Sequence, residues 1–372
     1  MSLKIDSLIG LGMIGCGSFG VFCLNAFAKV KELKIIAVAD VNERLAKKAA
    51  HKFKCKWYSK TQELINDPEV EIVHIVTPPS THFSLSRYAL QKEKHVLCEK
   101  PLALSLSEAD EILNLARENG VILPVNLVLR YVPITNIIKE IIQSEILGDP
   151  LRAYFENYAT DSNLDKAHWF WDKKQSGGIF VEHGVHFFDL YHYWFGNGKV
   201  IWAYSAKRSN TNQEDRVLCV LRHQSGVISH HYHGFDQPSI LDRQKHHILF
   251  ERGDIVINGW IPESFIINAI LNDNDIFQLK NICKNAKFKV LEKFTINENK
   301  FECHGKSFTA DQHLQVQYTS NVEKLTIYSS AIAGLVIDQI NFIRNREHKR
   351  VIREENGREA LRMALETSNY IS

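Results

Sequence analysis

The chain has 372 residues, more than the roughly 100–150 of a typical domain, so we expect two domains. Apolar residues make up 45% of it and charged residues 24%, which excludes a disordered, collagen-like or coiled-coil chain. The net charge of +2 disfavours nucleic acid or an anionic membrane as a partner. Seven widely spaced cysteines without a CxxC pair indicate reduced thiols in a cytoplasmic protein.

The segment Leu8–Ala28 has no charged residue, a property it shares with signal peptides and membrane spans. We interpret it instead as a strand followed by a turn, because five glycines interrupt any continuous apolar helix. These glycines are Gly10, Gly12, Gly15, Gly17 and Gly20.

Apolar runs and helical stretches alternate over the first 125 residues. The predicted strands are Leu11–Ile14, Lys34–Ala39, Ile72–Val76, His95–Leu97 and Val121–Val125. The clearest predicted helices are Asn42–Phe53, Ser80–Gln91 and Ser107–Asn119, the last with a serine cap at its start and Gly120 at its end. This alternation predicts a doubly wound parallel sheet with helices on both faces.

After Pro150 the pattern changes to strands without helices between them. These strands are Leu151–Ala159, Val200–Lys207, Arg216–Arg222, Val227–His233 and His246–Phe250. Helices are predicted near Val181–Phe195, Ser329–Arg344 and Gly357–Tyr370. We therefore expect an α/β protein in which residues 1–126 form a Rossmann domain. Residues 127–372 are expected to form a second, α+β domain with a mostly antiparallel sheet.

A glycine-rich loop follows the first predicted strand. Gly15-Cys-Gly-Ser-Phe-Gly20 is a G-x-G-x-x-G motif, and Asp40 ends the next strand 20 residues later. Gly15 permits the tight turn, Gly17 the approach of a pyrophosphate, and Gly20 close packing of helix and strand. Asp40 can bind both ribose hydroxyls and repels a 2′-phosphate, and no basic residue follows at positions 41–43, so NAD is favoured over NADP.

Three more motifs follow in register with this loop. They are Thr77-Pro-Pro-Ser-Thr-His82, Glu99-Lys-Pro101, and Gly177-Gly-Ile-Phe-Val-Glu-His-Gly-Val-His-Phe-Phe-Asp189. Together with the glycine loop they resemble the Gfo/Idh/MocA family of glucose–fructose oxidoreductase, inositol dehydrogenase and rhizopine-catabolism proteins. Leu129-Arg-Tyr-Val-Pro133 is similar to the Arg-aromatic-x-Pro segment of that family.

The resemblance implies an NAD(P)-dependent dehydrogenase or reductase that moves a hydride between nicotinamide and a carbinol or ketone carbon of a sugar, polyol or sugar derivative. It also implies that the α+β domain of residues 127–372 carries a large, mostly antiparallel open sheet that binds substrate, and that the chain forms a homodimer or homotetramer through this sheet. The cofactor-binding residues would be Gly15, Gly17, Ser18, Phe19, Gly20, Asp40, Val41, Thr77, Pro78, Pro79, His82, Glu99 and Lys100.

The chemistry requires a proton carrier and a donor to the substrate oxygen. Lys100 follows a strand end, where ligands of parallel sheets bind, and can donate to that oxygen. Glu182 and His186 are four residues apart and would share a helix face, with His186 carrying the proton. Family members often have Asp where this chain has Glu182. For Asp189 we expect a buried, bracing carboxylate.

Arg130, Tyr131, Trp171 and His183 are predicted to line the substrate pocket, with packing between domains as the alternative for the aromatic residues. No metal site is predicted. Two histidine clusters, His230/His231/His233 and His246/His247, are interpreted as a polar sheet surface at an oligomer interface or in the substrate pocket.

Two alternative functions stay open at this point. One is a glycosidase of the same fold that retains NAD and consumes none of it, and the other is a non-catalytic NAD-binding regulator. No motif specifies the substrate, the stereochemistry of its hydroxyls, the physiological direction or the oligomer size.

Overall fold

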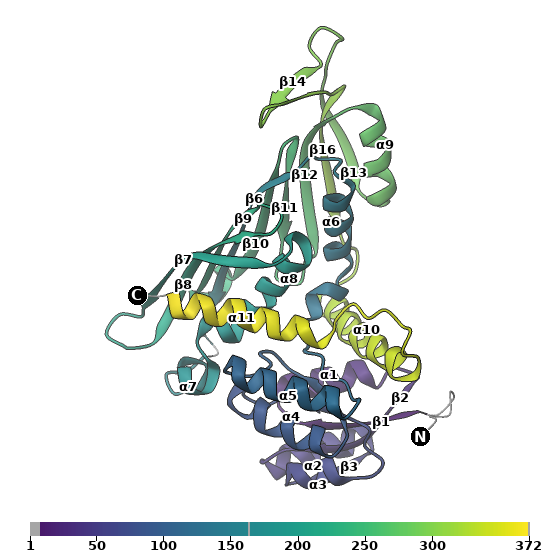
Figure 1. Cartoon of the computed structure of the whole chain (residues 1–372), viewed down its shortest axis with the longest axis vertical. Helices are drawn as coiled ribbons and strands as arrows, with labels where there is room; N and C mark the ends of the chain where they lie inside the picture. The colour runs from purple at the N-terminus through teal and green to yellow at the C-terminus, as the bar shows by residue number, and fades with distance from the viewer. Residues whose placement is uncertain (1–7, 163, 371–372) are drawn as a thin grey trace. The chain divides into compact units, whose positions relative to one another are not determined.

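The computed structural model describes residues 8–370 except residue 163. The chain divides into two compact units, drawn with element labels in Figure 1. The first comprises Met1–Tyr131, Ala167–Asp189 and Tyr328–Leu365, and the second Val132–Lys166, Leu190–Ile327 and Glu366–Ser372. The boundary after residue 126 stays a prediction, because two later segments of the chain also join the first unit.

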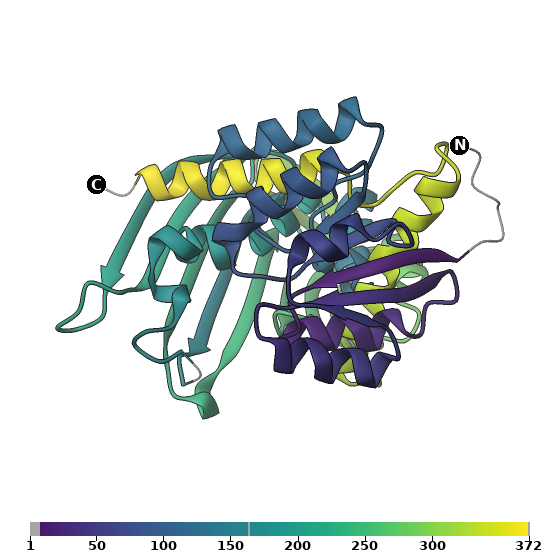
Figure 2. The same ribbon diagram turned by 90° about the horizontal axis from the view of Figure 1, so that it is seen from below.

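The first unit contains a five-stranded parallel sheet with the strand order β3-β2-β1-β4-β5. Its strands are β1 (Ile9–Ile14), β2 (Leu33–Ala39), β3 (Lys56–Tyr58), β4 (Ile72–Ile75) and β5 (His95–Cys98). The connecting helices are α1 (Ser18–Phe27), α2 (Glu43–Phe53), α3 (Thr61–Asn66), α4 (His82–Gln91) and α5 (Leu106–Glu118). Figure 2 shows helices on both sides of this sheet, as the alternating pattern predicts.

Four of the five strands predicted in this region are confirmed, and Leu8–Ala28 folds as β1 and α1. The fifth prediction, Val121–Val125, is wrong: only Val125 forms a bridge, to Cys98. Pro124 lacks a backbone N–H and so interrupts a regular ladder. The edge strand β3 has no apolar run, and its residues are largely exposed, so the pattern did not indicate it.

Two helix starts are capped by side chains. Asn42 accepts a hydrogen bond from the backbone N–H of Arg44 at the start of α2. At α5 the cap is Ser105, which accepts from the N–H of Glu108, so the predicted serine cap at Ser107 is two residues late. These caps fix where the connections from β2 and β5 end.

The second unit is built on a nine-stranded sheet with the order β13-β16-β12-β11-β10-β6-β9-β8-β7. Only β6 and β9 pair in parallel, so the sheet is mostly antiparallel as predicted. Its strands are β6 (Pro150–Thr160), β7 (Gly198–Lys207), β8 (Glu214–His223), β9 (Ile228–Gln237), β10 (Arg243–Phe250), β11 (Gly253–Asn258), β12 (Ser264–Leu271), β13 (Lys287–Lys293) and β16 (Gln312–Thr319). A separate hairpin consists of β14 (Lys300–Cys303) and β15 (Lys306–Thr309).

Helices of this unit include α6 (Pro133–Ser144) and α9 (Asp273–Ile282), neither of which was predicted. Burial alternates along the central strands, so one face of the sheet is covered and the other is open. In β12, for example, the residues from Phe265 to Leu271 alternate between buried and partly exposed. This period of two is the expected pattern of a half-buried sheet.

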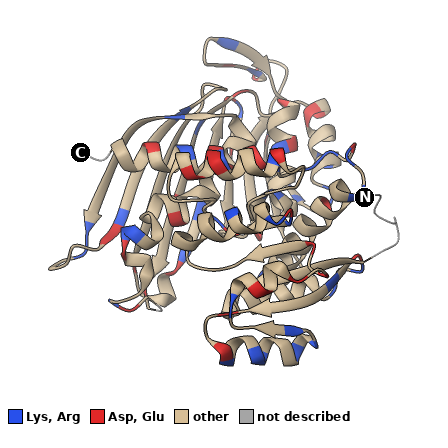
Figure 3. Ribbon diagram, turned by 60° about the horizontal axis from the view of Figure 1, so that its bottom comes forward, with Lys and Arg blue, Asp and Glu red and all other residues tan. Residues whose placement is uncertain are grey.

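Four further α-helices are present among the described residues. They are α7 (Lys173–Ser176), α8 (Val185–Phe195), α10 (Lys324–Arg344) and α11 (Glu354–Tyr370). Among the described residues, α10 is the one helix long and apolar enough to cross a membrane, and half of its apolar window is buried within the protein. A core helix of a globular protein has the same properties. Figure 3 shows basic and acidic residues interspersed along the ribbon, in keeping with the small net charge.

Candidate active site

The glycine loop runs from the end of β1 into α1. Gly15 has a φ of +102°, and a Cβ there would lie 2.0 Å from the carbonyl oxygen of Val76. A Cβ on Gly20 would lie 2.1 Å from the carbonyl oxygen of Gly15, whereas one on Gly17 would meet nothing within 4 Å. Gly15 and Gly20 therefore serve the fold, while Gly17 leaves open space before the N-terminus of α1. That is the form of a pyrophosphate cradle.

Asp40 lies immediately after β2, next to the glycine loop. Its carboxylate accepts hydrogen bonds from the backbone N–H groups of Cys16, at 2.7 Å, and Asn42, at 2.8 Å. These bonds fix the carboxylate at the strand end while each oxygen keeps a further lone pair for a ribose hydroxyl. Exposed Ser18 and half-buried Phe19 begin α1, directly after the glycine loop, and exposed Val41 follows Asp40. The Phe19 ring stacks on Tyr328 with a centroid distance of 6.0 Å.

His82 holds together the segments that follow β4 and β5. Its ring nitrogens lie 2.8 Å from the carbonyl oxygen of Thr77 and 2.7 Å from that of Pro101. The side chain is fully buried, which lowers its pKa below the usual value of 6.5. His82 thus braces the loops from inside, and its predicted contact with cofactor stays a prediction, as do those of Pro78 and Pro79.

Lys100 and Glu182 form an ion pair at the strand end. The Lys100 ammonium donates to the Glu182 backbone carbonyl at 2.7 Å and also to its carboxylate. The Lys100 and Glu182 side chains are 18% and 13% exposed, so the pair is largely shielded from water but is still accessible from the surface. The Glu182 side chain is thus long enough to reach the Lys100 ammonium.

The backbone around Glu182 departs from the predicted α-helix. Phe180–Gly184 forms a π-helix, and the α-helix α8 (Val185–Phe195) begins only after it. Single π-helical turns are frequent at functional sites because they redirect side chains. Burial and the positive charge of Lys100 lower the pKa of His186 well below 6.5. His186 is therefore a neutral imidazole near neutral pH.

The four residues predicted to contact substrate have different surroundings. The Arg130 guanidinium donates to both carboxylate oxygens of buried Asp189, at 2.8 and 2.6 Å, which confirms the bracing role of Asp189. Tyr131 donates to Asp338 at 2.6 Å, and burial raises its pKa. Trp171 contacts Phe170 edge to face, and the ring of His183 lies 5.1 Å from that of Phe187. Substrate contacts of these four residues stay a prediction.

Sequence reasoning missed a buried network beneath Lys100. The carboxylate of Glu99 lies 3.1 Å from Nε2 of His74 and accepts from the Asn126 amide at 2.7 Å. Nδ1 of His74 is buried and has no hydrogen-bond partner among the described residues, so the ring is held through Nε2. Over residues 8–370 apart from 163, Cys23, His74 and Glu99 form the one group spaced closely enough to share a metal ion. The sequence feature that indicates this network is His74, a single polar residue in the apolar run before Thr77.

The five clustered histidines were interpreted as a polar sheet surface, and this interpretation is wrong for three of these residues. His231, His233 and His246 are fully buried in the core of the second unit, packed around Phe155 and Tyr191. As predicted, His231 and His233 share one face of β9, but that face is the covered one. His230 and His247 lie on the partly exposed face.

The ends of β1, β2, β4 and β5 thus bring together the glycine loop, the Asp40 carboxylate and Lys100 paired with Glu182. This arrangement is that of a dinucleotide-binding Rossmann fold. The chain matches the sequence model of the oxidoreductase family with NAD-binding Rossmann fold over residues 9–127. It also matches the GFO/IDH/MocA C-terminal domain over residues 136–256. The chain belongs to the Gfo/Idh/MocA family.

Individual relatives agree with this assignment. The chain is 31% identical to scyllo-inositol 2-dehydrogenase (NAD(+)) of Bacillus subtilis, over 52% of this chain and 55% of that protein. It is 28% identical to myo-inositol 2-dehydrogenase of Thermotoga maritima, over 59% of this chain and 66% of that protein. The matches span between about half and two thirds of the length of these two relatives.

Solved structures share the fold over nearly the whole chain. The WlbA dehydrogenase of Bordetella pertussis, in complex with NADH and UDP-GlcNAcA, has a TM-score of 0.78 and 17% identity, covering 98% of this chain and 96% of that one. A levoglucosan dehydrogenase in complex with NADH and levoglucosan also has a TM-score of 0.78, at 16% identity, covering 98% of this chain and 97% of that one.

Proposed function

We propose that the protein is an NAD-dependent dehydrogenase or reductase of a sugar, a polyol or a sugar derivative. The observation that carries this proposal is the Lys100–Glu182 pair at the end of β5, with His186 four residues further on, at the same sheet edge as the nucleotide loop. Dehydrogenases of inositols among the relatives support the substrate class.

The residues present fit a nicotinamide dinucleotide. Gly17 leaves room for the pyrophosphate, and Asp40 presents a fixed carboxylate without a neighbouring basic residue, which supports NAD over NADP. When bound, the nicotinamide supplies the hydride acceptor or donor. Thr77 and Glu99 follow the ends of β4 and β5 and would lie along the cofactor.

The side chains of this chain would handle the proton and the charge on the substrate oxygen. Lys100 donates a hydrogen bond to that oxygen and stabilises negative charge as it develops. His186, being neutral, accepts the hydroxyl proton during oxidation and returns it during reduction. Glu182 orients the Lys100 ammonium through both its carboxylate and its backbone carbonyl.

A turnover screen tests this proposal. Purified protein would be given NAD+ with a panel of inositols, hexoses and sugar acids, and NADH with the matching ketones, while nicotinamide absorbance is followed. We expect turnover for at least one member and a fall of about 100- to 1,000-fold in kcat/KM for Lys100→Met, because one donor to the developing negative charge is lost. Hydrolysis of a glycoside without net NADH formation would instead favour the NAD-retaining glycosidase. NADH binding without turnover of any kind would favour the regulator.

We further infer that the protein acts in the cytoplasm as a homodimer or homotetramer. All seven cysteines are free thiols, which suits a reducing compartment. Ile201, Trp202 and Tyr204 of β7 are 43%, 44% and 56% exposed on the open sheet, and exposed aromatic residues are typical of interfaces. Sedimentation of the wild type and of Trp202→Lys checks this: a monomeric wild type would contradict the oligomer.

A further inference from the structure

Glu99 is a buried carboxylate at the end of β5, directly before Lys100. Its side chain is 8% exposed, and its Oε1 accepts a hydrogen bond from the Asn126 amide at 2.7 Å and lies 3.1 Å from Nε2 of His74. His74 and Asn126 are themselves buried. Both contacts are made with Oε1, and Oε2 has no hydrogen-bond partner in the part of the chain that the structure describes. The carboxylate is therefore held at one oxygen, in surroundings that largely exclude water.

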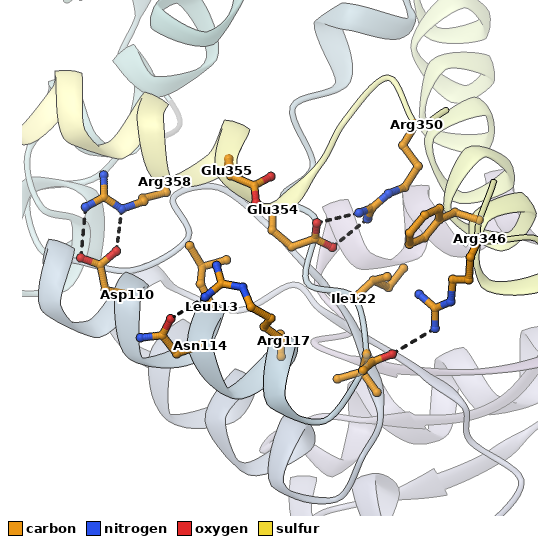
Figure 4. Close-up of a pocket in the computed structure, with 14 residues that line it drawn as sticks. Asp110, Leu113, Asn114, Arg117, Ile122, Arg346, Arg350, Glu354, Glu355 and Arg358 are labelled. Atoms are coloured by element: carbon orange, nitrogen blue, oxygen red, sulfur yellow. Dashed lines mark hydrogen bonds and ion pairs between the residues drawn. The ribbon is translucent and has the colours of Figure 1, made fainter. Parts of the chain in front are cut away.

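No arginine or lysine lies at ion-pair distance from Glu99 among the described residues. Figure 4 shows two carboxylates of the same unit that do have such a partner. Both oxygens of Asp110 accept hydrogen bonds from Arg358, and this side chain is 45% exposed. Both oxygens of Glu354 accept from Arg350, and this side chain is 18% exposed. The most buried of the three carboxylates is thus the one without an arginine or lysine beside it, although a buried charge is costly unless it is paired.

The groups around Glu99 supply hydrogen bonds but no permanent positive charge. Burial and the negative charge of Glu99 raise the pKa of the Cys23 thiol and that of the Tyr328 hydroxyl, and neither group can become a cation. His74 becomes a cation only when it is protonated at both nitrogens. A proton on its Nδ1 would have no acceptor within the described residues, because that atom is buried and has no hydrogen-bond partner there.

Two features put Glu99 on the side of the proposed cofactor site that would take the nicotinamide. Asp40, at the end of β2, marks the half of the Rossmann sheet that would hold the adenosine ribose, so β4 and β5 belong to the other half. Tyr328, on which the charge of Glu99 acts, stacks on Phe19 in the first turn of α1, directly after the glycine loop. Glu99 is also the residue that precedes Lys100, the proposed donor to the substrate oxygen.

We propose that the Glu99 carboxylate supplies the negative charge that stabilises the oxidised nicotinamide ring, and that His74 and Asn126 are positioning residues that hold this carboxylate in place. The oxidised ring carries a positive charge and the reduced ring does not, so the carboxylate favours NAD+ over NADH as the bound form. At an effective dielectric constant of about 20, opposite unit charges within about 10 Å of each other change an affinity roughly tenfold. This inference rests on the proposed function and adds to it the balance between the two redox forms of the cofactor.

The test is the ratio of the dissociation constants of NAD+ and NADH, measured by calorimetric titration of the full chain. Glu99→Gln keeps the size of the side chain and one acceptor oxygen but removes the charge, so it should raise Kd(NAD+)/Kd(NADH) about tenfold. Glu71→Gln is the matched control, because the Glu71 carboxylate lies at the opposite end of β4, where it accepts from the N–H of Gly10 at 3.0 Å. This control should keep the wild-type ratio. The same ratio in both variants overturns the proposal.

Two further measurements test other sources of positive charge beside Glu99. His74→Gln keeps a donor for Oε1 but cannot be protonated, and its ratio should stay close to that of the wild type. A lower ratio in this variant would overturn the proposal, because a protonated His74 would then be the cation paired with Glu99. Metal analysis of the wild type and of Cys23→Ser tests the closely spaced group of Cys23, His74 and Glu99. Stoichiometric zinc that is lost in Cys23→Ser would also overturn the proposal.

Glu99→Met provides the same comparison if Glu99→Gln does not fold. It replaces the carboxylate by an apolar side chain of similar size, and such replacements of buried charged groups are often neutral or stabilising. The outcomes also separate this inference from the proposed function. Absence of binding of either nucleotide to the wild type would refute the proposed function and this inference with it. Binding of both nucleotides with an unchanged ratio in Glu99→Gln would refute this inference alone.

Discussion

Removing either partner of the Lys100–Glu182 pair should reveal how strongly the two side chains are coupled. We consider Lys100→Met, Glu182→Gln and the double variant. Breaking a fully buried pair costs about 3–5 kcal/mol, and an exposed pair contributes about 0–1 kcal/mol. With side chains 18% and 13% exposed, this pair lies between these limits. We expect a coupling free energy of ~2 kcal/mol from the double-mutant cycle.

Urea unfolding of the four proteins gives the coupling, and Lys47–Glu43 supplies the control. That pair also has an N–O distance below 3 Å, at 2.8 Å, but its side chains are 52% and 54% exposed. Its coupling should be about 0.3–0.5 kcal/mol. If both cycles give the same small value, Glu182 does not hold Lys100 in place, and the reasoning from burial is wrong.

Three other perturbations give distinct outcomes. Burial lowers the pKa of His223 to about 4 and that of His246 to about 3. Below about pH 6.5 the unfolded chain therefore takes up protons that the folded protein does not, and the free energy of unfolding falls with the pH. By about pH 5 each histidine should lower the free energy of unfolding, measured with urea, by up to ~2 kcal/mol. His246→Phe should lose less stability than the wild type between about pH 6.5 and about pH 5, and an equal loss in the variant contradicts this. His74→Leu removes one hydrogen-bond partner of buried Glu99 and should lower the free energy of unfolding by ~2 kcal/mol and also lower kcat. His74→Gln can restore a donor and should recover much of both losses. If His74→Gln recovers neither, His74 acts through packing alone. Gly17→Ala should leave the melting temperature unchanged, because the added Cβ meets no protein atom within 4 Å. The variant should bind NADH at least about tenfold more weakly, because this Cβ enters the space proposed for the pyrophosphate. An unchanged NADH affinity would place the cofactor elsewhere.

The sequence was sufficient to predict the parts of the fold and site that depend on local patterns. Strands with apolar runs, the glycine loop and Asp40 follow directly from periodicity and spacing, and the structure places them at one sheet edge. The short strand Lys56–Tyr58 was missed because it lies at an edge and carries no apolar run. Pro124 was overlooked as a break in a run that otherwise reads as a strand.

Long-range pairing could not be read from the sequence. Nothing local indicates that Lys100 meets Glu182, 82 positions later, or that His74 lies against Glu99. The buried histidines show the same limit. His231 and His233 alternate correctly along their strand, but whether that face is covered depends on α8, whose Tyr191 packs against His231. The π-helix at Phe180–Gly184 has no signal in the hydrophobic pattern either.

The most direct measurement is a fluorescence titration of the purified protein with NADH and with NADPH, repeated with Asp40→Asn. The substitution keeps the size of the side chain and removes the charge that binds ribose hydroxyls and repels a 2′-phosphate. We predict that the wild type binds NADH more tightly than NADPH. Asp40→Asn should weaken NADH binding about tenfold or more and reduce the ratio of NADH affinity to NADPH affinity. No binding of either nucleotide to the wild type would contradict the assignment of this sheet edge as a dinucleotide site.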